Sequence, residues 1–201
     1  SAGQGNDTVH RFTGFTSGVF EFKIQTFVPA DATGASYVIL LNTYDDPPGA
    51  PIADYRWSLQ VRLDADTGLV TAEGGASETA PLVTGQWVEL RAVIDLDADL
   101  VDYFYNGVEF ASDRSWTNGI SANGVARIEA IDLYGNEPGG GGTSGIYYDD
   151  ISLGRPTTSC PCDWNHANGL NSQDFFDFLT DFFAGNADFN HSGSTNSQDF
   201  F

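Results

Sequence analysis

Apolar and polar residues alternate with a period of two through much of the first three quarters of the chain. Val19–Phe27 and Arg56–Leu63 show this pattern, and Gly85–Asp95 is the strongest predicted strand. The alternation places one face of an extended strand in a core and leaves the other face in water. Tyr37–Leu41 is a continuous apolar run, which is typical of a strand that is covered on both faces. This part of the chain therefore has to build packed sheets.

Turn signals separate these segments into short strands. Asp64–Gly68 predicts a turn that leads into a strand over Leu69–Glu73, and Asn106-Gly107 is a hairpin signal between apolar segments at Val101–Tyr105 and Val108–Phe110. Further strands are predicted over 125–133 and 145–153. Many short strands and no long helix before residue 155 predict a mostly β protein, an antiparallel β-sandwich of the jelly-roll type. Loops are expected over the proline-rich residues 44–51 and the glycine-rich residues 136–145.

The central strands carry a recognisable motif. Gly85-Gln-Trp87-Val-Glu-Leu is followed by an acidic turn and then by Tyr103-Phe-Tyr-Asn106-Gly107-Val. This order resembles the paired central strands of laminin-G-like, or concanavalin-A-like, jelly rolls. A galactose-binding-like jelly roll is the alternative fold. The closing Tyr147–Leu153 is similar to the last strand of many carbohydrate-binding jelly rolls, and that resemblance implies that Asp150 helps to bind a structural calcium ion.

One sequence motif occurs twice near the C-terminus. Asp163–Asp174 and Asp188–Asp199 begin 25 residues apart (188 − 163), and each has oxygen-bearing side chains at positions 1, 3, 9 and 12. In calcium loops, alternate side chains and one backbone carbonyl converge on the ion with this spacing. Asx-rich turns without metal are the competing interpretation, because Asn, Asp and Gly favour turns in any case.

The duplicated loop resembles the dockerin family, whose small secreted modules carry two EF-hand-like calcium loops. Asp at position 12 and Asn at position 9 are the features that match. Loop one departs from the pattern at Ala167 and has its glycine one place late, so we expect it to bind more weakly. The chain reaches its last residue, Phe201, where the family has a second helix. The resemblance implies these Ca²⁺ ligands: Asp163, Asn165, Gly169, Asn171, Asp174, Asp188, Asn190, Ser192, Ser194, Asn196 and Asp199.

A helix is predicted between the two loops, over Gln173–Ala184. Phe175, Phe178, Leu179 and Phe182 follow the spacing of one helix face, with Phe176 and Phe183 beside it, and Gly185 and Asn186 provide the stop. Its apolar surface has to pack on the sandwich, on a continuation of the chain or on another molecule. We therefore expect 1–154 to be the sandwich, 155–162 a linker and 163–201 the paired-loop module.

The composition excludes several classes of partner. The net charge is −20 and Lys23 is the only lysine, so a nucleic-acid phosphate backbone would find no basic cluster. No apolar stretch has the roughly 20 residues of a membrane span. The chain has no Met and starts Ser-Ala-Gly, which suggests that a leader was removed. Together with the dockerin resemblance, this predicts a secreted or cell-surface bacterial protein. Cys160 and Cys162 are candidates for a strained mutual disulfide or for pairing with other chains.

No catalytic constellation is apparent. Jelly-roll glucanases carry a Glu-x-Asp-x-x-Glu string, which is missing from this sequence. Tryptophan rings can stack on sugars, so Trp116, in an expected loop, is predicted to be an exposed platform, and Trp57 is a second candidate. Trp87 is expected in the core. The sequence thus predicts a non-catalytic, calcium-binding adhesion protein that contacts glycan or a matrix polymer, with a tail that docks to a cohesin-like partner.

Self-association is the alternative to docking. The Phe-rich helix would then pack on a neighbouring subunit, and the protein would be a structural protomer of an extracellular filament or surface layer.

Overall fold

A computed structural model describes residues 6–45, 54–136, 145–156, 164, 171–189 and 193–200. The chain divides into two compact units, Ser1–Arg155 and Pro156–Phe201. The expected linker, including Cys160 and Cys162, lies almost entirely outside the described residues, as do most of the expected proline-rich and glycine-rich loops.

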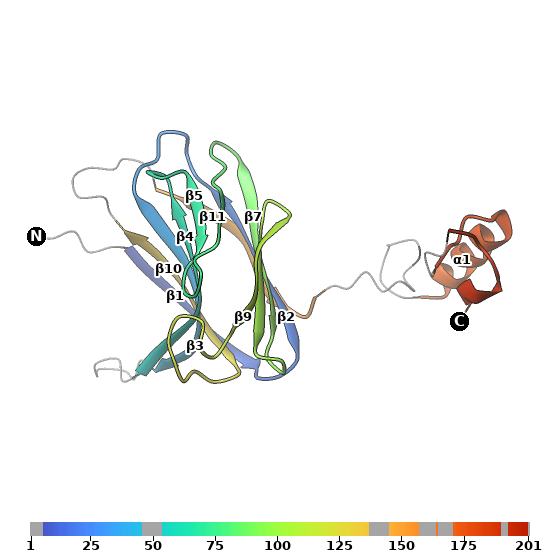
Figure 1. Cartoon of the computed structure of the whole chain (residues 1–201), viewed down its shortest axis with the longest axis horizontal. Coiled ribbons are helices and arrows are strands. Elements are labelled where there is room, and N and C mark those ends of the chain that lie inside the picture. Colours follow the sequence, from blue (N-terminus) through green and yellow to red (C-terminus); the bar gives the residue numbers. More distant parts are fainter. Residues whose placement is uncertain are drawn as a thin grey trace, which may run out of the picture. The chain divides into compact units, whose positions relative to one another are not determined.

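The first unit contains a six-stranded sheet in the order β1-β10-β3-β4-β5-β6 (Figure 1). All of its neighbouring strands are antiparallel. Its strands are β1 (Asn6–Phe15), β3 (Ala35–Asp45), β4 (Asp54–Asp64), β5 (Leu69–Ala72), β6 (Thr79–Pro81) and β10 (Ile128–Asn136).

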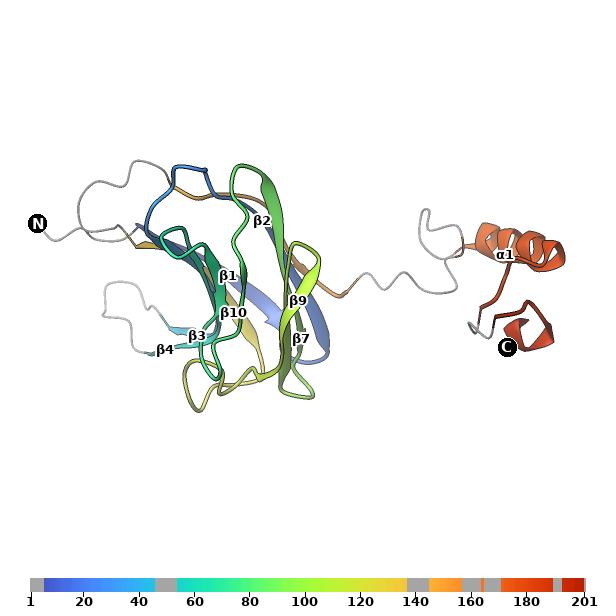
Figure 2. The ribbon, with the colours of Figure 1, turned by 45° about the horizontal axis from the view of Figure 1, so that its top comes forward.

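A five-stranded antiparallel sheet faces it, in the order β11-β2-β7-β8-β9. Figure 2 shows the two sheets as separate layers. The strands are β2 (Val19–Phe27), β7 (Trp87–Asp95), β8 (Leu100–Tyr105), β9 (Val108–Ser115) and β11 (Tyr147–Gly154). The predicted antiparallel β-sandwich is confirmed.

The core lies between the two sheets and consists of the residues that alternation predicts. Phe20, Phe22 and Ile24 of β2 face inward, and Leu90 and Ile94 lie beside them on β7, the neighbouring strand of the same sheet. Every second residue of β2 and β7 is buried, as expected for strands with one wet face.

The apolar run in β3 is buried on both faces of its sheet. Val38 and Leu40 point into the core, whereas Ile39 and Leu41 belong to a second cluster with Ala130 of β10. On that outer face, aromatic side chains take the place of a second layer of secondary structure. The predicted two-sided burial of this strand is confirmed.

Two strands of the structure, β1 and β6, were not predicted from the sequence. The hairpin at Asn106-Gly107 is confirmed, with φ values of 52° and 75° in the left-handed region that such a turn requires. Among the described residues, no helix is long and apolar enough to cross a membrane.

The second unit is built on helix α1 (Ser172–Ala184). It begins at a capping box of Asn171 and Asp174 and ends at Gly185, whose φ of 79° is left-handed, so the predicted helix and its stop are confirmed. Phe178 packs edge-on against Trp164 and Phe189. A short 3₁₀ turn, η1, follows at Ser197–Phe200.

Candidate functional site

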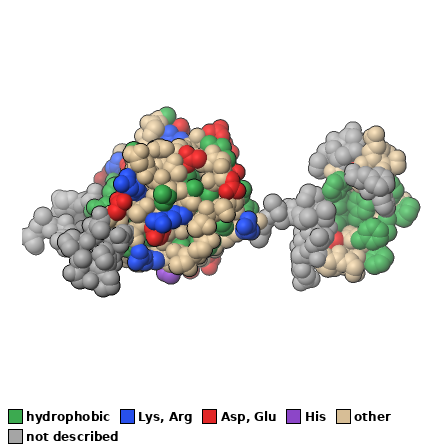
Figure 3. Space-filling model, turned by 90° about the horizontal axis from the view of Figure 1, so that it is seen from below, with side chains coloured by type: hydrophobic (Ala, Val, Ile, Leu, Met, Phe, Trp, Pro, Cys, Tyr) green, Lys and Arg blue, Asp and Glu red, His purple; other side chains and the backbone are tan. Residues whose placement is uncertain are grey.

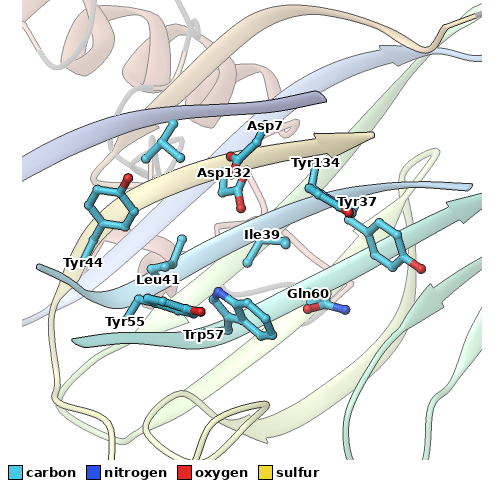
Figure 4. A pocket seen from close by; sticks show the side chains of 11 residues that line it. Asp7, Tyr37, Ile39, Leu41, Tyr44, Tyr55, Trp57, Gln60, Asp132 and Tyr134 are labelled. Carbon is cyan, nitrogen blue, oxygen red and sulfur yellow. The ribbon is translucent and has the colours of Figure 1, made fainter. Parts of the chain in front are cut away.

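A groove of about 410 Å³ lies on the outer face of the six-stranded sheet. Its walls come from β1, β3, β4 and β10, four strands that are neighbours in the sheet (Figure 4). Five of the lining side chains are aromatic and two are carboxylates. The lining residues are Asp7, Val9, Tyr37, Ile39, Leu41, Tyr44, Tyr55, Trp57, Gln60, Asp132 and Tyr134.

Strand register brings these residues together from distant parts of the chain. Val9, Asp132, Ile39 and Gln60 pair in one row across the four strands. In the next row, Tyr134 pairs with Asp7 on one side and with Tyr37 on the other. Because side chains alternate between the two faces of a sheet, each row points to the same side.

The groove has two aromatic pairs above an aliphatic floor. The ring centroids of Tyr55 and Trp57 are 5.9 Å apart with an interplanar angle of 32°. Tyr37 and Tyr134 form a second pair at 6.0 Å and 47°. Ile39 lies between the pairs, and Leu41 lies beside Tyr55 and Trp57 (Figure 4).

Two carboxyl groups share the other wall. Asp132 and Asp7 lie side by side on β10 and β1 (Figure 4), close enough to hydrogen bond when one of them is protonated. Burial, then the hydrogen bond and negative charge of Asp7, raise the pKa of Asp132 from 3.8 to about 7. The Oδ1 atom of Asp132 is buried and accepts no hydrogen bond from the described residues.

A loop between β9 and β10 holds Trp57 in position. Register shifts interrupt the pairing of β3 with β4 beside Trp57. The Trp57 backbone N–H donates to Ser121 Oγ at 3.1 Å, and its carbonyl accepts from Ser121 N at 2.9 Å. At Gly119, a Cβ would overlap the carbonyl oxygen of Ser58, so only glycine permits this close approach of loop and strand.

Trp116 anchors that loop and is not a surface platform. Its side chain is 0% exposed, and its indole N–H donates to the carbonyl oxygen of Arg127 at 2.9 Å. The predicted exposure of Trp116 is therefore wrong, because the ring belongs to the main cluster of buried hydrophobic residues. Trp57, the second candidate, does line the groove.

Trp87 also differs from its prediction. It is 49% exposed, on the outer face of the five-stranded sheet, where it contacts Phe27 and Phe27 in turn contacts Tyr147. The phase of β7 explains this position: Val88, Leu90, Ala92 and Ile94 point inward, so Trp87 points outward.

Asp149 and Asp150 are both exposed, where alternation would have turned them to opposite faces. The pairing of β11 with β2 shifts between Asp149 and Ser152, and Asp150 has a φ of 48°. The backbone N–H of Asp150 donates to the Asp149 carboxylate at 2.8 Å. Calcium binding by Asp150 stays a prediction.

The two C-terminal repeats close in the same way. Asp174 accepts a hydrogen bond from Asn171 N, and Asp199 accepts one from Asn196 N, each at 2.7 Å. The side-chain oxygen of each Asn accepts from the backbone two residues later, at 2.8 and 2.9 Å. Asp174 is 1% and Asp199 is 2% exposed. Residues 9 and 12 of each repeat therefore cap a helical turn, a function that the sequence analysis did not assign to them.

In the second repeat, the start of the loop is also visible. Asp188 Oδ2 accepts from Gly193 N at 2.7 Å, and Gly193 has the left-handed φ of 88° that suits the sharp turn of a calcium loop. Ser194 is exposed next to it. These oxygen donors fit a hard cation. The other expected ligands lie outside the described residues: Asp163, Asn165, Gly169, Asn190 and Ser192. Within the described part of the chain, His, Cys, Asp and Glu form no group of three or more that could hold a metal.

Several solved structures resemble this fold at low sequence identity. A protein described as a sialidase matches 89% of this chain at 14% identity with a TM-score of 0.51, and the chain spans 16% of that protein. An endo-β-1,4-glucuronan lyase from the fungus Trichoderma reesei has a TM-score of 0.50 at 14% identity, over 75% of this chain and 74% of the lyase. A Caenorhabditis elegans galectin has a TM-score of 0.48 at 15% identity, over 74% of this chain and 90% of the galectin.

The likeness establishes a jelly-roll-like β-sandwich. At these identities it is evidence of the fold alone. No family model matches the sequence, and no curated protein matches it.

Proposed function

We propose that the sandwich is a glycan-binding module and that the groove on the six-stranded sheet is its site. The observation that carries this proposal is the tilted pair of Tyr55 and Trp57 in a groove that also presents the carboxyl groups of Asp7 and Asp132. An aromatic face complements the C–H face of a sugar ring, and adjacent polar groups fix the orientation of its hydroxyls.

The same geometry favours binding without catalysis. Glycosidases hold their two carboxyl groups about 5–9.5 Å apart, on either side of the scissile bond. Asp7 and Asp132 lie within hydrogen-bonding reach of each other, which leaves no room between them for a glycosidic oxygen. We infer a non-catalytic adhesion role.

Trp57→Ala tests the site. We expect the variant to lose about tenfold or more in affinity for the glycan that the protein binds, because stacking contributes about 1 kcal/mol or more beyond area burial. Trp87→Ala is the matched control, since it removes an exposed tryptophan from the opposite sheet. A glycan array followed by calorimetry would measure both. Loss of affinity in Trp87→Ala alone would move the site to the five-stranded sheet.

We further propose that the C-terminal unit is a dockerin-like calcium module of a secreted protein, and that it attaches the sandwich to a partner. The repeated spacing of oxygen donors supports this, as does the turn from Asp188 to Gly193. Asp188, Ser194, Asn196 and Asp199 would hold the ion in the second loop, and Asn171 and Asp174 in the first. Bound calcium would neutralise the acids that crowd each loop.

Calcium removal tests the tail. In scanning calorimetry of the whole chain, we expect EDTA to lower the melting temperature of the C-terminal unit, because an ion at 100 times its Kd stabilises a fold by about 2.7 kcal/mol. The double variant Asp174→Asn/Asp199→Asn should lose this calcium-dependent shift, whereas Asp177→Asn, on the same helix, should keep it. An unchanged melting profile in EDTA would contradict the calcium assignment.

The exposed phenylalanines favour self-association as a second candidate function. Phe175, Phe176 and Phe183 of α1 are 52%, 59% and 81% exposed. Hydrophobic side chains gather on the visible face of the C-terminal unit (Figure 3). Sedimentation velocity of the intact protein distinguishes the two roles: a concentration-independent monomer favours docking to another protein, and growing oligomers favour a filament protomer.

A further inference from the structure

We propose that the groove selects a cationic glycan, one whose sugars carry free ammonium groups, over neutral glycans of the same length. This inference rests on the proposed function and names the ligand class of the same site. The features that support it are the paired carboxyl groups of Asp7 and Asp132, the aromatic walls, and the lack of lysine and arginine among the lining residues.

The pair of Asp7 and Asp132 lacks a positively charged hydrogen-bond donor among the residues that line the groove. Burial, together with the hydrogen bond and the negative charge of Asp7, raises the pKa of Asp132 to about 7, so ionising this carboxyl group beside Asp7 is unfavourable. The buried Oδ1 of Asp132 also has no hydrogen-bond donor among the described residues. An ammonium group in the groove would supply both a positive charge and hydrogen-bond donors, since it has three N–H donors and no acceptor.

The rest of the groove also suits an organic cation. Five aromatic rings line it, and the faces of tyrosine and tryptophan rings attract a cation that lies within about 6 Å. Arg11 already uses this attraction at one end, where its guanidinium carbon lies 5.3 Å from the centroid of the Tyr44 ring. The net charge of −20 would in addition draw cations toward the molecule.

A metal ion suits the groove less well. Calcium takes about 6–8 oxygen ligands, whereas the lining offers two carboxyl groups and otherwise mainly aromatic and aliphatic side chains. The described residues contain no group of three or more His, Cys, Asp or Glu at this place. The mixture of aromatic faces and paired acids is that of a site for a charged organic group.

The proposal predicts a pH dependence set by Asp132. The titratable groups that line the groove with it are Asp7 on β1, Tyr37 and Tyr44 on β3, Tyr55 on β4 and Tyr134 on its own strand. Two charged groups lie at its borders: Arg11 packs over the Tyr44 ring, and Glu73 accepts a hydrogen bond from uncharged Gln60 on β4. Arg62, further along β4, is paired with Asp64 at 2.7 Å. Because the carboxylate form binds the cation, affinity for a permanently charged trimethylammonium sugar should rise as the pH rises through about 7.

The test compares two chito-oligosaccharides of equal length by calorimetry on the full chain, one deacetylated and one fully N-acetylated. At pH 7 we expect the deacetylated oligomer to bind about tenfold more tightly, as a desolvated cation–π contact together with an ion pair would give. Asp132→Asn and Asp7→Asn should each remove most of this preference. The control Asp97→Asn removes the same charge from an exposed turn and should keep it. Thermal melts would verify that each variant folds.

Any other result would overturn the inference, and the different results can be told apart. Equal binding of the two oligomers, or binding of the acetylated one alone, overturns charge selection and leaves the glycan site standing. A preference that survives both Asp132→Asn and Trp57→Ala would come from net charge and not from the groove. Calcium binding that depends on Asp132, without any amine preference, would assign the acid pair to a metal. If no glycan binds, the proposed function fails as well.

Discussion

Replacing Trp116 with alanine should cost about 3–5 kcal/mol of unfolding free energy, although Trp116 does not line the groove. The ring is fully buried and its N–H satisfies the carbonyl of Arg127. The truncation would leave a cavity and an unpaired carbonyl beneath the loop that carries Ser121. Chemical denaturation of the sandwich measures this loss.

The same variant should bind glycan poorly even at temperatures where it stays folded. Ser121 makes two hydrogen bonds with the backbone of Trp57, so a loosened loop releases the central aromatic residue of the groove. Trp87→Ala deletes the same atoms from a half-exposed position, and its cost should be smaller, about 1–2 kcal/mol, because about half of that surface already meets water. Equal costs for the two variants would show that Trp116 is not an anchor.

Asp132→Asn should stabilise the sandwich above pH 7 by about 1–2 kcal/mol and leave it unchanged near pH 4. In the folded protein, the pKa of Asp132 is raised from 3.8 to about 7. Between these values the folded state binds more protons than the unfolded state, so this residue makes stability fall as the pH rises toward 7. Because Asp132 is only half-buried, solvent screening limits the effect to this size.

Thermal melts of both proteins from pH 4 to pH 8 would measure the difference. Other carboxylates contribute their own pH dependence, and subtracting the variant's curve from the parent's isolates that of Asp132. A difference that grows toward low pH would have the opposite sign and would contradict the shared-proton pair.

The alternating strands and the helix were within reach of sequence reasoning because their signals are local. The phase of β2 and β7 places their core residues, and Asn171 and Gly185 mark the ends of α1. The same phase contradicts the core assignment of Trp87, since Trp87 is out of step with Val88 and Leu90. β1, which mixes polar residues and glycine, and the three-residue β6 carry weaker local signals.

The groove was beyond sequence reasoning for a physical reason. Asp7 and Asp132 become neighbours only because β1 pairs with β10, and Trp57 joins them only because β3 lies between β10 and β4. Periodicity says which face a residue takes, but it does not say which strands adjoin. The burial of Trp116 likewise depends on a loop that passes close to β4 at Gly119.

The irregular strand β11 has a consequence for how copies of the sandwich can meet. It forms one edge of the five-stranded sheet, and an edge strand offers unpaired backbone groups to other molecules. Three features make β11 unsuitable for pairing with another strand. They are the register shift after Asp149, the left-handed backbone conformation of Asp150, and the two adjacent negative charges. Molecules of this protein should therefore not pair with one another through β11, even at high protein concentration. Any ordered polymer would have to grow through other contacts.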